Sequence, residues 1–238
     1  MKRLVFFTGA GMSAESGLPT FRGRGGIWDE IDARAVASRE AWYCGRRHDA
    51  RLRRQRVLDF FNPIRRAILS HEPNEGHRLI AALEARHEVT VITQNGDDFH
   101  ERAGSTQVIH LHGEALRNAS TLHPHESYPI DPAHPDLHIG DKAPDGSQLR
   151  PYVVFFGEDL EMPLWRRAVN AIRDADALVV VGSTLLVHPA ADLLAYVRPD
   201  CPLWCIDPEE VTLPEGCRQA TCLHLCATDG LRQLCKNW

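Results

Sequence analysis

Short, continuously apolar runs recur along the chain, and stretches with helical spacing separate them. The runs do not alternate between apolar and polar positions, which is the pattern of strands covered on both faces. Residues 74–87 and 164–175 carry apolar residues at helical spacing, and residues 189–198 begin with a proline in the first turn. Strands that alternate with helices predict an α/β fold with a parallel, doubly wound sheet. The apolar runs are residues 4–7, 88–95, 107–113, 151–157, 177–183, 202–207 and 221–226.

Two long segments interrupt this rhythm. Residues 24–71 are rich in arginine and helical in tendency, whereas residues 115–150 are rich in proline, aspartate and histidine without clear periodicity. Loops of that length are uncommon inside a compact domain unless they form a structure of their own. We therefore expect the two insertions to form a smaller lobe. The six arginines between positions 46 and 56 are interpreted as a solvated helix face. The remaining Rossmann-like domain would consist of residues 1–23, 72–114 and 151–238.

Composition and charge narrow the class of protein. The 238 residues are 43% hydrophobic and 25% charged, which suits one large globular domain or one domain with an insertion. The net charge of −5 gives no indication of a nucleic-acid or membrane partner, and no segment reaches the roughly 18 apolar residues that span a bilayer. The first apolar run is too short for a signal peptide, so we expect a cytoplasmic protein. The seven cysteines include no C-x-x-C pair, and we expect reduced thiols.

A glycine turn follows the first apolar run. Gly9, Gly11 and Ala14 satisfy the pattern G-x-G-x-x-[G/A], in which the first glycine allows a tight turn and the second lets a pyrophosphate approach the backbone. The third small residue lets the next helix pack closely on the strand, and the N–H groups of that helix face the phosphates. The acidic residue that a dehydrogenase carries on its second strand has no clear counterpart here. The turn therefore indicates a dinucleotide site and argues against an ordinary dehydrogenase.

Five motifs follow one another in a specific order, namely GAGMSAESGLPTFRG, TQNGDDFHERAG, VIHLHGE, VVFFGE and VVGSTLLVHPAADL. Their combination resembles the sirtuin family of NAD-dependent protein deacylases, and it looks closest to the bacterial branch. The resemblance covers most of the chain and weakens in the two insertions. It implies a Rossmann-like parallel sheet with a smaller lobe, NAD as a co-substrate that is consumed, and acylated protein lysines as partners.

The resemblance implies which residues hold NAD. Phe21 and Arg22 would lie on a mobile loop over the nicotinamide ribose and the phosphates, where a guanidinium can clamp anionic oxygens with paired donors. Asp207 stands where the family usually has an asparagine near the adenine ribose. The implied cofactor-binding residues are Gly9, Ala10, Gly11, Ser13, Phe21, Arg22, Gln94, Asn95, Asp97, Gly182, Ser183, Thr184 and Asp207.

The resemblance also implies the chemistry. The acyl-lysine oxygen attacks the anomeric carbon of the nicotinamide ribose, and nicotinamide leaves. Asn95 and Asp97 would face the nicotinamide amide and ribose and stabilise charge at that carbon. His112 would be the catalytic base that accepts a ribose hydroxyl proton, so the products are nicotinamide, free lysine and O-acyl-ADP-ribose. His110, two positions earlier, projects to the same side of a strand and is interpreted as structural.

Substrate recognition is expected on the segment that contains VVFFGE. Its backbone would pair with an extended peptide, and Phe155 and Phe156 would flank the acyl-lysine channel. Some bacterial relatives bind acidic acyl groups with a tyrosine and an arginine in the small lobe, and Phe61 and Ile64 occupy the corresponding positions here. We therefore expect neutral acyl groups. The implied substrate-binding residues are Val153, Val154, Phe155, Phe156 and Gly157.

The chain departs from the family pattern in its second insertion. Members usually hold a structural zinc in the small lobe with two C-x-x-C pairs, but residues 115–150 contain no cysteine. Structural zinc sites strongly favour thiolates over an all-histidine set, so we expect no metal site. The histidines of the insertion are His123, His125, His134 and His138.

Alternatives from other classes stay open. An ADP-ribosyltransferase or NAD-cleaving enzyme on the same fold would use the same cofactor site; the missing cysteines weaken the match to deacylases, while His112 supports it. A non-catalytic NAD-binding sensor would not require Asn95, Asp97 and His112. A hydride-transferring dehydrogenase is less well supported than either.

Overall fold

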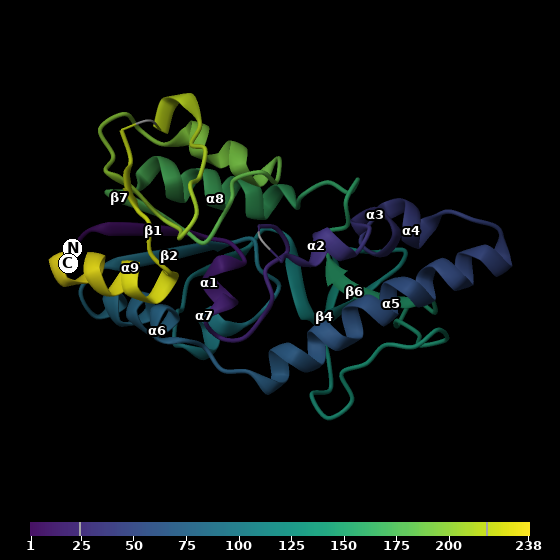
Figure 1. The fold of residues 1–238 in the computed structure, drawn as a ribbon. Coiled ribbons are helices and arrows are strands. Elements are labelled where there is room, and N and C mark those ends of the chain that lie inside the picture. Colours follow the sequence, from purple (N-terminus) through teal and green to yellow (C-terminus); the bar gives the residue numbers. More distant parts are fainter. Residues whose placement is uncertain (24, 218) are drawn as a thin grey trace.

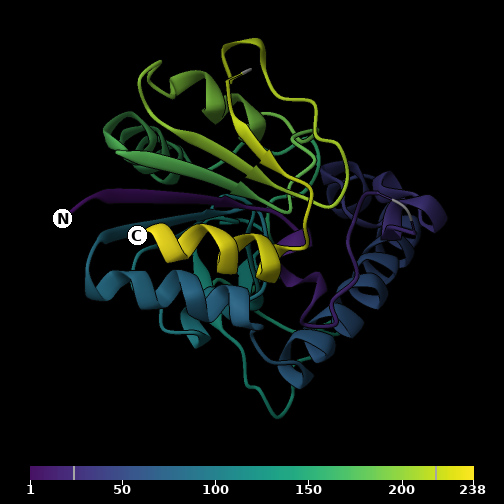
Figure 2. The same cartoon turned by 60° about the vertical axis from the view of Figure 1, so that its left-hand side comes forward.

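The computed structural model describes residues 1–23, 25–217 and 219–238, apart from the side chains of Arg47 and Asn237. It has two unequal parts: a sheet with helices on both faces, and an elongated lobe along which a long helix runs to the far end (Figure 1). Both chain ends lie on the sheet part, away from that lobe, in Figures 1 and 2.

Strands and helices alternate through most of the chain, and a long helical stretch is inserted after the first strand. The strands are β1 (Arg3–Thr8), β2 (Glu88–Thr93), β3 (Val108–His110), β4 (Gly113–Ser120), β5 (Ser127–Pro129), β6 (Leu149–Val153), β7 (Ala177–Val181), β8 (Leu203–Ile206) and β9 (Thr221–Leu223). The α-helices are α1 (Gly11–Ala14), α2 (Ile27–Glu30), α3 (Ala33–Val36), α4 (Arg39–Tyr43), α5 (Arg47–Ser70), α6 (Glu75–Ala82), α7 (Phe99–Arg102), α8 (Met162–Asp174) and α9 (Ala227–Leu234). The 3-10 helices are η1 (Leu83–Ala85), η2 (Ala190–Tyr196), η3 (Glu215–Cys217) and η4 (Cys235–Asn237).

The main sheet is parallel and six-stranded, in the order β3-β2-β1-β7-β8-β9, which confirms the predicted doubly wound architecture. The chain builds outward from β1 through β2 to β3, and it later returns beside β1 to build outward from β7. In such sheets ligands bind at the carboxyl ends of the strands beside this reversal. The ends of β1, β2 and β7 are therefore the expected position of the site.

Alternate residues of β1 enter two separate cores, one on each face of the sheet. Leu4 and Phe6 pack with α6, η1 and α9, while Val5 and Phe7 pack with α8 and η2. All four side chains are at most 2% exposed, which explains why the run carries no polar position. Figure 2 shows α6 and α9 on one side of the sheet and α8 on the other. The predicted helix at residues 189–198 is the 3-10 helix η2 instead of an α-helix. No helix within the described part of the chain is both long enough and apolar enough to span a bilayer.

The smaller lobe contains α2 to α5 and an antiparallel sheet in the order β5-β4-β6. The run at residues 151–157 was expected in the main sheet, and that expectation is wrong. β6 pairs antiparallel with β4 instead, with Gly113 opposite Val153. An apolar run predicts a buried strand but does not specify its partner, which here is the strand that directly follows β3.

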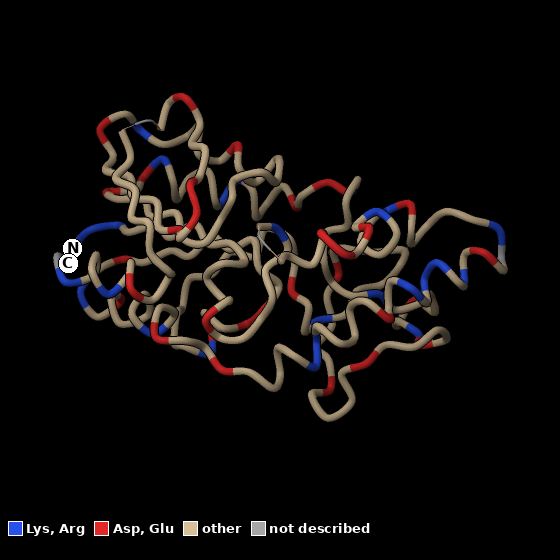
Figure 3. The backbone as a smooth tube through the Cα atoms, viewed as in Figure 1, with Lys and Arg blue, Asp and Glu red and all other residues tan. Residues whose placement is uncertain are grey.

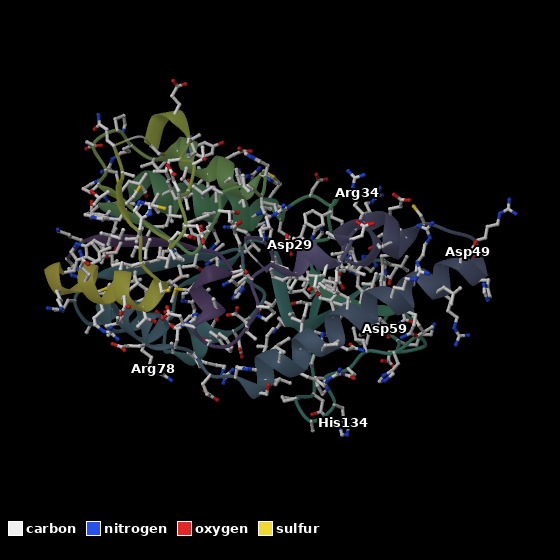
Figure 4. The ribbon with its side chains drawn as sticks, viewed as in Figure 1. Asp29, Arg34, Asp49, Asp59, Arg78 and His134 are labelled. Carbon is white, nitrogen blue, oxygen red and sulfur yellow. The ribbon has the colours of Figure 1, made fainter. Side chains whose placement is uncertain are left out.

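The arginine run lies on the first half of α5, at the far end of the lobe, where Figure 3 shows several basic positions. Arg46, Arg51 and Arg56 are exposed, as expected for a solvated helix. The expectation does not hold for Arg54, which is half-buried, lies over the Trp42 ring and donates to Trp42 O at 2.9 Å. The labelled side chains of Arg34 and Asp49 also point away from the lobe in Figure 4. The side chain of Arg47, which belongs to the same run, is outside the described part.

A buried ion pair organises the core of the lobe. Arg150, whose side chain is 1% exposed, donates to both carboxylate oxygens of Glu158 at 2.6 and 2.9 Å. Its guanidinium lies 3.8 Å from the ring centroid of Phe155 and donates to Val153 O at 2.8 Å. The arginine therefore holds the end of β6 and the segment after it in one arrangement.

A second polar cluster joins the end of β4 to the hairpin that leads into β6. The hydroxyl of Ser120 donates to Asp145 and accepts from the N–H groups of Leu122 and His123 at 3.0 and 3.1 Å. Asp145 also accepts from the N–H of Ser147 at 2.8 Å. These hydrogen bonds lower the pKa of Asp145, which keeps the acceptor ionised. The cluster joins two side chains to three backbone N–H groups and so ties β4 to the hairpin.

Replacing Arg150 should destabilise the protein strongly. An Arg150→Met variant would leave the Glu158 carboxylate buried without its partner, and breaking a buried pair in this way costs about 3–5 kcal/mol. Urea denaturation followed by circular dichroism measures the change. The exposed Arg167→Met provides a control that should stay within about 0.5 kcal/mol of the wild type. Equal stability of Arg150→Met and wild type would contradict the role of this pair.

Candidate active site

Three glycines bring the end of β1 against the end of β7. The N–H of Gly9 donates to Val181 O at 3.0 Å, and the N–H of Gly11 donates to Gly182 O at 2.9 Å. A Cβ on Gly9 would lie 2.6 Å from Gly182 O, and one on Gly11 would lie 2.6 Å from Gly182 Cα. Gly182 itself has φ +60°, a conformation that favours glycine. Because both N–H groups are donated within the protein, these two glycines permit close backbone packing and do not themselves offer donors to a phosphate.

Ser13, Asn95 and Asp97 form one buried network beyond the ends of β1 and β2. Ser13 Oγ donates to Asp97 Oδ2 at 2.9 Å, and Asn95 Nδ2 donates to Gly9 O at 3.0 Å and approaches Ser13 Oγ at 3.3 Å. The three residues are 2%, 5% and 6% exposed. Burial raises the pKa of Asp97 to about 6, although hydrogen bonds from Ser13 and the N–H of Phe99 oppose that rise. The structure thus brings three of the predicted residues into contact.

Gln94 and Ser183 join β2 to β7 across β1. Gln94 Nε2 donates to Ser183 Oγ at 2.7 Å, and the Gln94 N–H donates to Thr8 O at 2.9 Å. Ser183 is buried, and its hydroxyl also accepts from the N–H of Leu185 at 3.4 Å. The two predicted cofactor residues therefore meet at the reversal point of the sheet.

His112 follows β3 and faces the same strand ends. Its Nδ1 lies 3.2 Å from Gln94 O, and because a carbonyl only accepts, Nδ1 carries the proton of this hydrogen bond. None of the described residues forms a hydrogen bond with Nε2. Burial lowers the pKa of His112, and the hydrogen bond to Gln94 opposes that shift. The result is an imidazole that is neutral at pH 7 and carries its lone pair on Nε2, as a general base requires.

Sequence analysis missed the support that lies beneath Asn95. Thr8 Oγ1 donates to Thr93 Oγ1 at 2.9 Å, and Thr93 Oγ1 accepts from the N–H of Asn95 at 3.1 Å. Both threonines are fully buried at the ends of their strands. The sequence feature that could have indicated this support is a threonine at the end of each apolar run, Thr8 before Gly9 and Thr93 before Gln94.

The loop that carries Phe21 and Arg22 is attached to the lobe by aromatic rings. Phe21 stacks on Trp28 with a centroid distance of 5.3 Å, Trp28 stacks on Phe60 at 5.4 Å, and Phe156 contacts Trp28 edge-on at 6.2 Å. Arg22 is exposed, and its side chain forms no hydrogen bond or ion pair with any described residue. The structure therefore does not bring Arg22 into the network of Asn95 and Asp97.

The predicted substrate segment differs from the expectation in two respects. Phe155 is 1% exposed and packs on Trp42 and beneath Arg150, so it belongs to the core of the lobe and does not flank a channel. The N–H groups of Val154 and Phe156 are donated to His112 O and Ala37 O at 2.9 and 2.8 Å, and that of Phe155 is donated to Glu158 at 2.9 Å. The N–H groups of these three residues are therefore not available for pairing with an added strand. Phe156 is 41% exposed and does face outward.

The remaining predicted residues lie around the central network. Ala10 precedes α1 as its N-cap, and Thr184 follows Ser183 with partial burial. Asp207 lies farther out, after β8, where burial raises its pKa and its carboxylate accepts from the N–H of Glu209 at 3.0 Å. It lines a cavity of about 110 Å³ together with Cys222 and His224.

No metal centre is formed by the described residues, because no group of three or more His, Cys, Asp or Glu side chains converges. The four histidines of the second insertion are all exposed. His134 and His138 each pair with a nearby aspartate instead.

Comparisons with known proteins agree with this geometry. Residues 9–189 match the Sir2 family. The chain is 43% identical to an NAD-dependent protein deacylase of Bacteroides thetaiotaomicron, over 98% of this chain and 97% of that protein. It is 40% identical to an NAD-dependent protein deacylase of Helicobacter pylori strain 26695, over 98% and 96%. Among solved structures, a Sir2 homolog–NAD complex superimposes with a TM-score of 0.81 at 32% identity, covering 98% of this chain and 88% of that one. A Sir2–p53 peptide–NAD+ complex gives a TM-score of 0.75 at 28% identity, covering 98% and 92%.

Replacing Asp97 by asparagine should stabilise the protein at neutral pH. Because the folded state raises the pKa of Asp97 from 3.8 to about 6, it binds the proton more tightly than the unfolded chain does. Stability therefore falls as the pH rises from about 4 to 6, and the full penalty of about 3 kcal/mol is present above pH 6. Asp97→Asn removes this penalty and should unfold at higher urea than the wild type at pH 7, with little difference near pH 4. Asp159→Asn, at an exposed position, is the control. A gain in stability of Asp97→Asn that is the same at pH 4 and pH 7 would contradict the raised pKa of Asp97.

Proposed function

The chain belongs to the Sir2 family and is an NAD-dependent protein deacylase, and we propose that His112 is the base of its reaction. The observation that supports this role is the single hydrogen bond of Nδ1 to Gln94 O, which leaves Nε2 as the basic nitrogen. Lysine residues of acylated proteins are its substrates, and a solved structure similar to this chain is a complex of Sir2 with a p53 peptide and NAD+.

The residues at the strand ends fit a bound NAD. The turn at Gly9 and Gly11 lies at the end of β1, where such sheets bind ligands, and the exposed guanidinium of Arg22, which pairs with none of the described residues, lies on the loop after this turn. We assign the sheet domain to NAD and the lobe side to the acylated peptide. NAD, when bound, would supply the anomeric carbon that takes the acyl oxygen and the ribose hydroxyl that takes up the acyl group, and one water would supply the oxygen and the protons needed to release free lysine.

Three side chains carry the chemistry in this proposal. His112 accepts the proton of the ribose hydroxyl at Nε2, which makes that oxygen nucleophilic. Asn95 holds the nicotinamide amide. The carboxylate of Asp97, which is mostly ionised at pH 7 with a pKa of about 6, stabilises positive charge at the anomeric carbon.

The lobe favours neutral acyl groups. Arg65 and Arg66 are the arginines nearest to Phe61 and Ile64. Arg65 is fully buried and donates to Pro135 O and Arg117 O at 3.0 and 2.9 Å, so its charge is not available to an acyl carboxylate. Arg66 pairs with Asp136. Phe156 offers an exposed aromatic ring, which can pack against an apolar acyl chain but cannot pair with a carboxylate.

We further propose that the small lobe needs no zinc. The hydroxyl of Ser120 and the carboxylate of Asp145 tie β4 to the next hairpin, and no cysteine occurs between residues 115 and 150. In this proposal, hydrogen bonds of Ser120 and Asp145 stabilise the part of the lobe that a zinc ion stabilises in other members of the family.

Incubation with NAD should convert acetyl-lysine and butyryl-lysine peptides and leave a succinyl-lysine peptide unchanged, because Arg65 and Arg66 already have partners within the lobe and do not pair with its carboxylate. Mass spectrometry follows nicotinamide, free lysine and O-acyl-ADP-ribose. His112→Ala should lower the rate by about 100-fold or more, the contribution of a general base. The exposed His134→Ala should react as the wild type does.

Other outcomes of the same assay identify the alternatives. An ADP-ribosyl group on the peptide, with the acyl group retained, would indicate a transferase. Absence of nicotinamide release with every acyl peptide would indicate a binding protein, and a wild-type rate for His112→Ala would contradict its role.

Removal of metal ions should change neither stability nor activity. Dialysis against EDTA should leave the thermal midpoint and the deacylation rate unaltered, whereas Ser120→Ala should lower stability by about 1 kcal/mol because it removes the hydrogen bonds that the hydroxyl forms with Asp145, Leu122 and His123. Differential scanning calorimetry before and after dialysis gives the midpoints, and the peptide assay gives the rates. A midpoint that falls on chelation and recovers with added zinc would disprove the proposal.

A further inference from the structure

His110 is buried beside Asn95 but has no part in the chemistry proposed above. Its Nδ1 lies 2.9 Å from Asn95 O and its Nε2 lies 2.8 Å from Glu101 Oε1. A carbonyl and a carboxylate both only accept, so both ring nitrogens must donate, and the imidazole is a cation. The side chain is 9% exposed, and that of Glu101 is 41% exposed.

The charges that surround His110 support this state. Burial alone would lower the pKa of the ring, but Glu101, the Asn95 carbonyl and Glu114 raise it to about 9. The positive charge of His110 lowers the pKa of Asp97 and so stabilises its carboxylate. Burial lowers the pKa of His100, which remains neutral.

The contact between His110 and the carbonyl of Asn95 fixes the peptide group that joins Asn95 to Gly96. The N–H of Asn95 is held by Thr93 and its side-chain NH₂ by Gly9 O, so His110 holds the remaining backbone polar group of the residue. The next residue is Gly96, and glycine has more conformational freedom to lose than any other residue. Without His110 the peptide group between Asn95 and Gly96 would lose its buried donor and could rotate.

We propose that His110 is a positioning residue for NAD, which acts by fixing the carbonyl of Asn95 so that the side-chain amide of Asn95 faces the nicotinamide. The inference rests on the proposed function of Asn95. The contact to Asn95 through Nδ1 determines NAD affinity, whereas the contact to Glu101 through Nε2 contributes to stability.

Two substitutions separate the two contacts. The amide nitrogen of asparagine can occupy the place of Nδ1, and that of glutamine the place of Nε2, so His110→Asn keeps the donor to Asn95 and His110→Gln keeps the donor to Glu101. His110→Gln should raise the Kd of NAD in calorimetry, and the KM of NAD in the assay, about fivefold or more, as loss of one buried hydrogen bond does. His110→Asn should remain within about twofold of the wild type in both, although it also loses thermal stability. His134→Asn, at an exposed histidine paired with Asp131, is the matched control.

The outcomes decide between positioning and plain structural support. Equal Kd values for both variants and the wild type, with lowered thermal midpoints, would overturn the proposal. It would also be overturned if the loss of NAD affinity in the two variants paralleled their loss of thermal stability, whichever donor each variant retains. Calorimetry requires no turnover. A wild type that binds NAD but deacylates nothing would contradict the proposed function, while a weaker Kd in His110→Gln alone would still support the positioning role.

Discussion

The site depends on the close approach of two backbone segments, the turn after β1 and the end of β7. Gly9 and Gly11 lie so near to Gly182 that no side chain fits between them. This contact fixes where Gly9 O is, and the amide of Asn95 is positioned by that oxygen. The bond between Gln94 and Ser183 then spans the same junction from the other strand. A wider spacing at the glycines would separate all of these partners at once.

Burial has opposite effects on the two kinds of ionisable groups near this junction. Burial keeps His112 neutral, so that its Nε2 is unprotonated and can accept a proton. Burial also disfavours the charged form of Asp97. The protein retains a carboxyl group where its ionisation is unfavourable for folding, which is typical of groups kept for function. The polar side chains around it supply the donors that limit this penalty.

The sequence was sufficient to predict the parallel sheet, because strands covered on both faces are apolar throughout, as Leu4 to Phe7 are. The resemblance to a known family placed the residues after β1, β2 and β7 in one cofactor site, which a parallel sheet allows because its strands end at one edge. It could not assign β6 to its sheet, because partner choice depends on pairing with Gly113 at long range. The direction of the Phe155 ring was likewise set by a neighbour, Arg150, whose burial no pattern indicated. The threonine support of Asn95 was hidden because a polar residue at a strand end has many possible partners.

The stack of Phe21, Trp28 and Phe60 connects elements that serve different ligands. Phe21 belongs to the loop assigned to NAD, Phe60 to the long helix of the lobe, and Phe156 to the segment assigned to the peptide. Trp28 therefore cannot move without changing its contacts with both Phe21 and Phe156. Thermodynamic reciprocity requires that any effect of a bound peptide on NAD affinity equals the effect of bound NAD on peptide affinity.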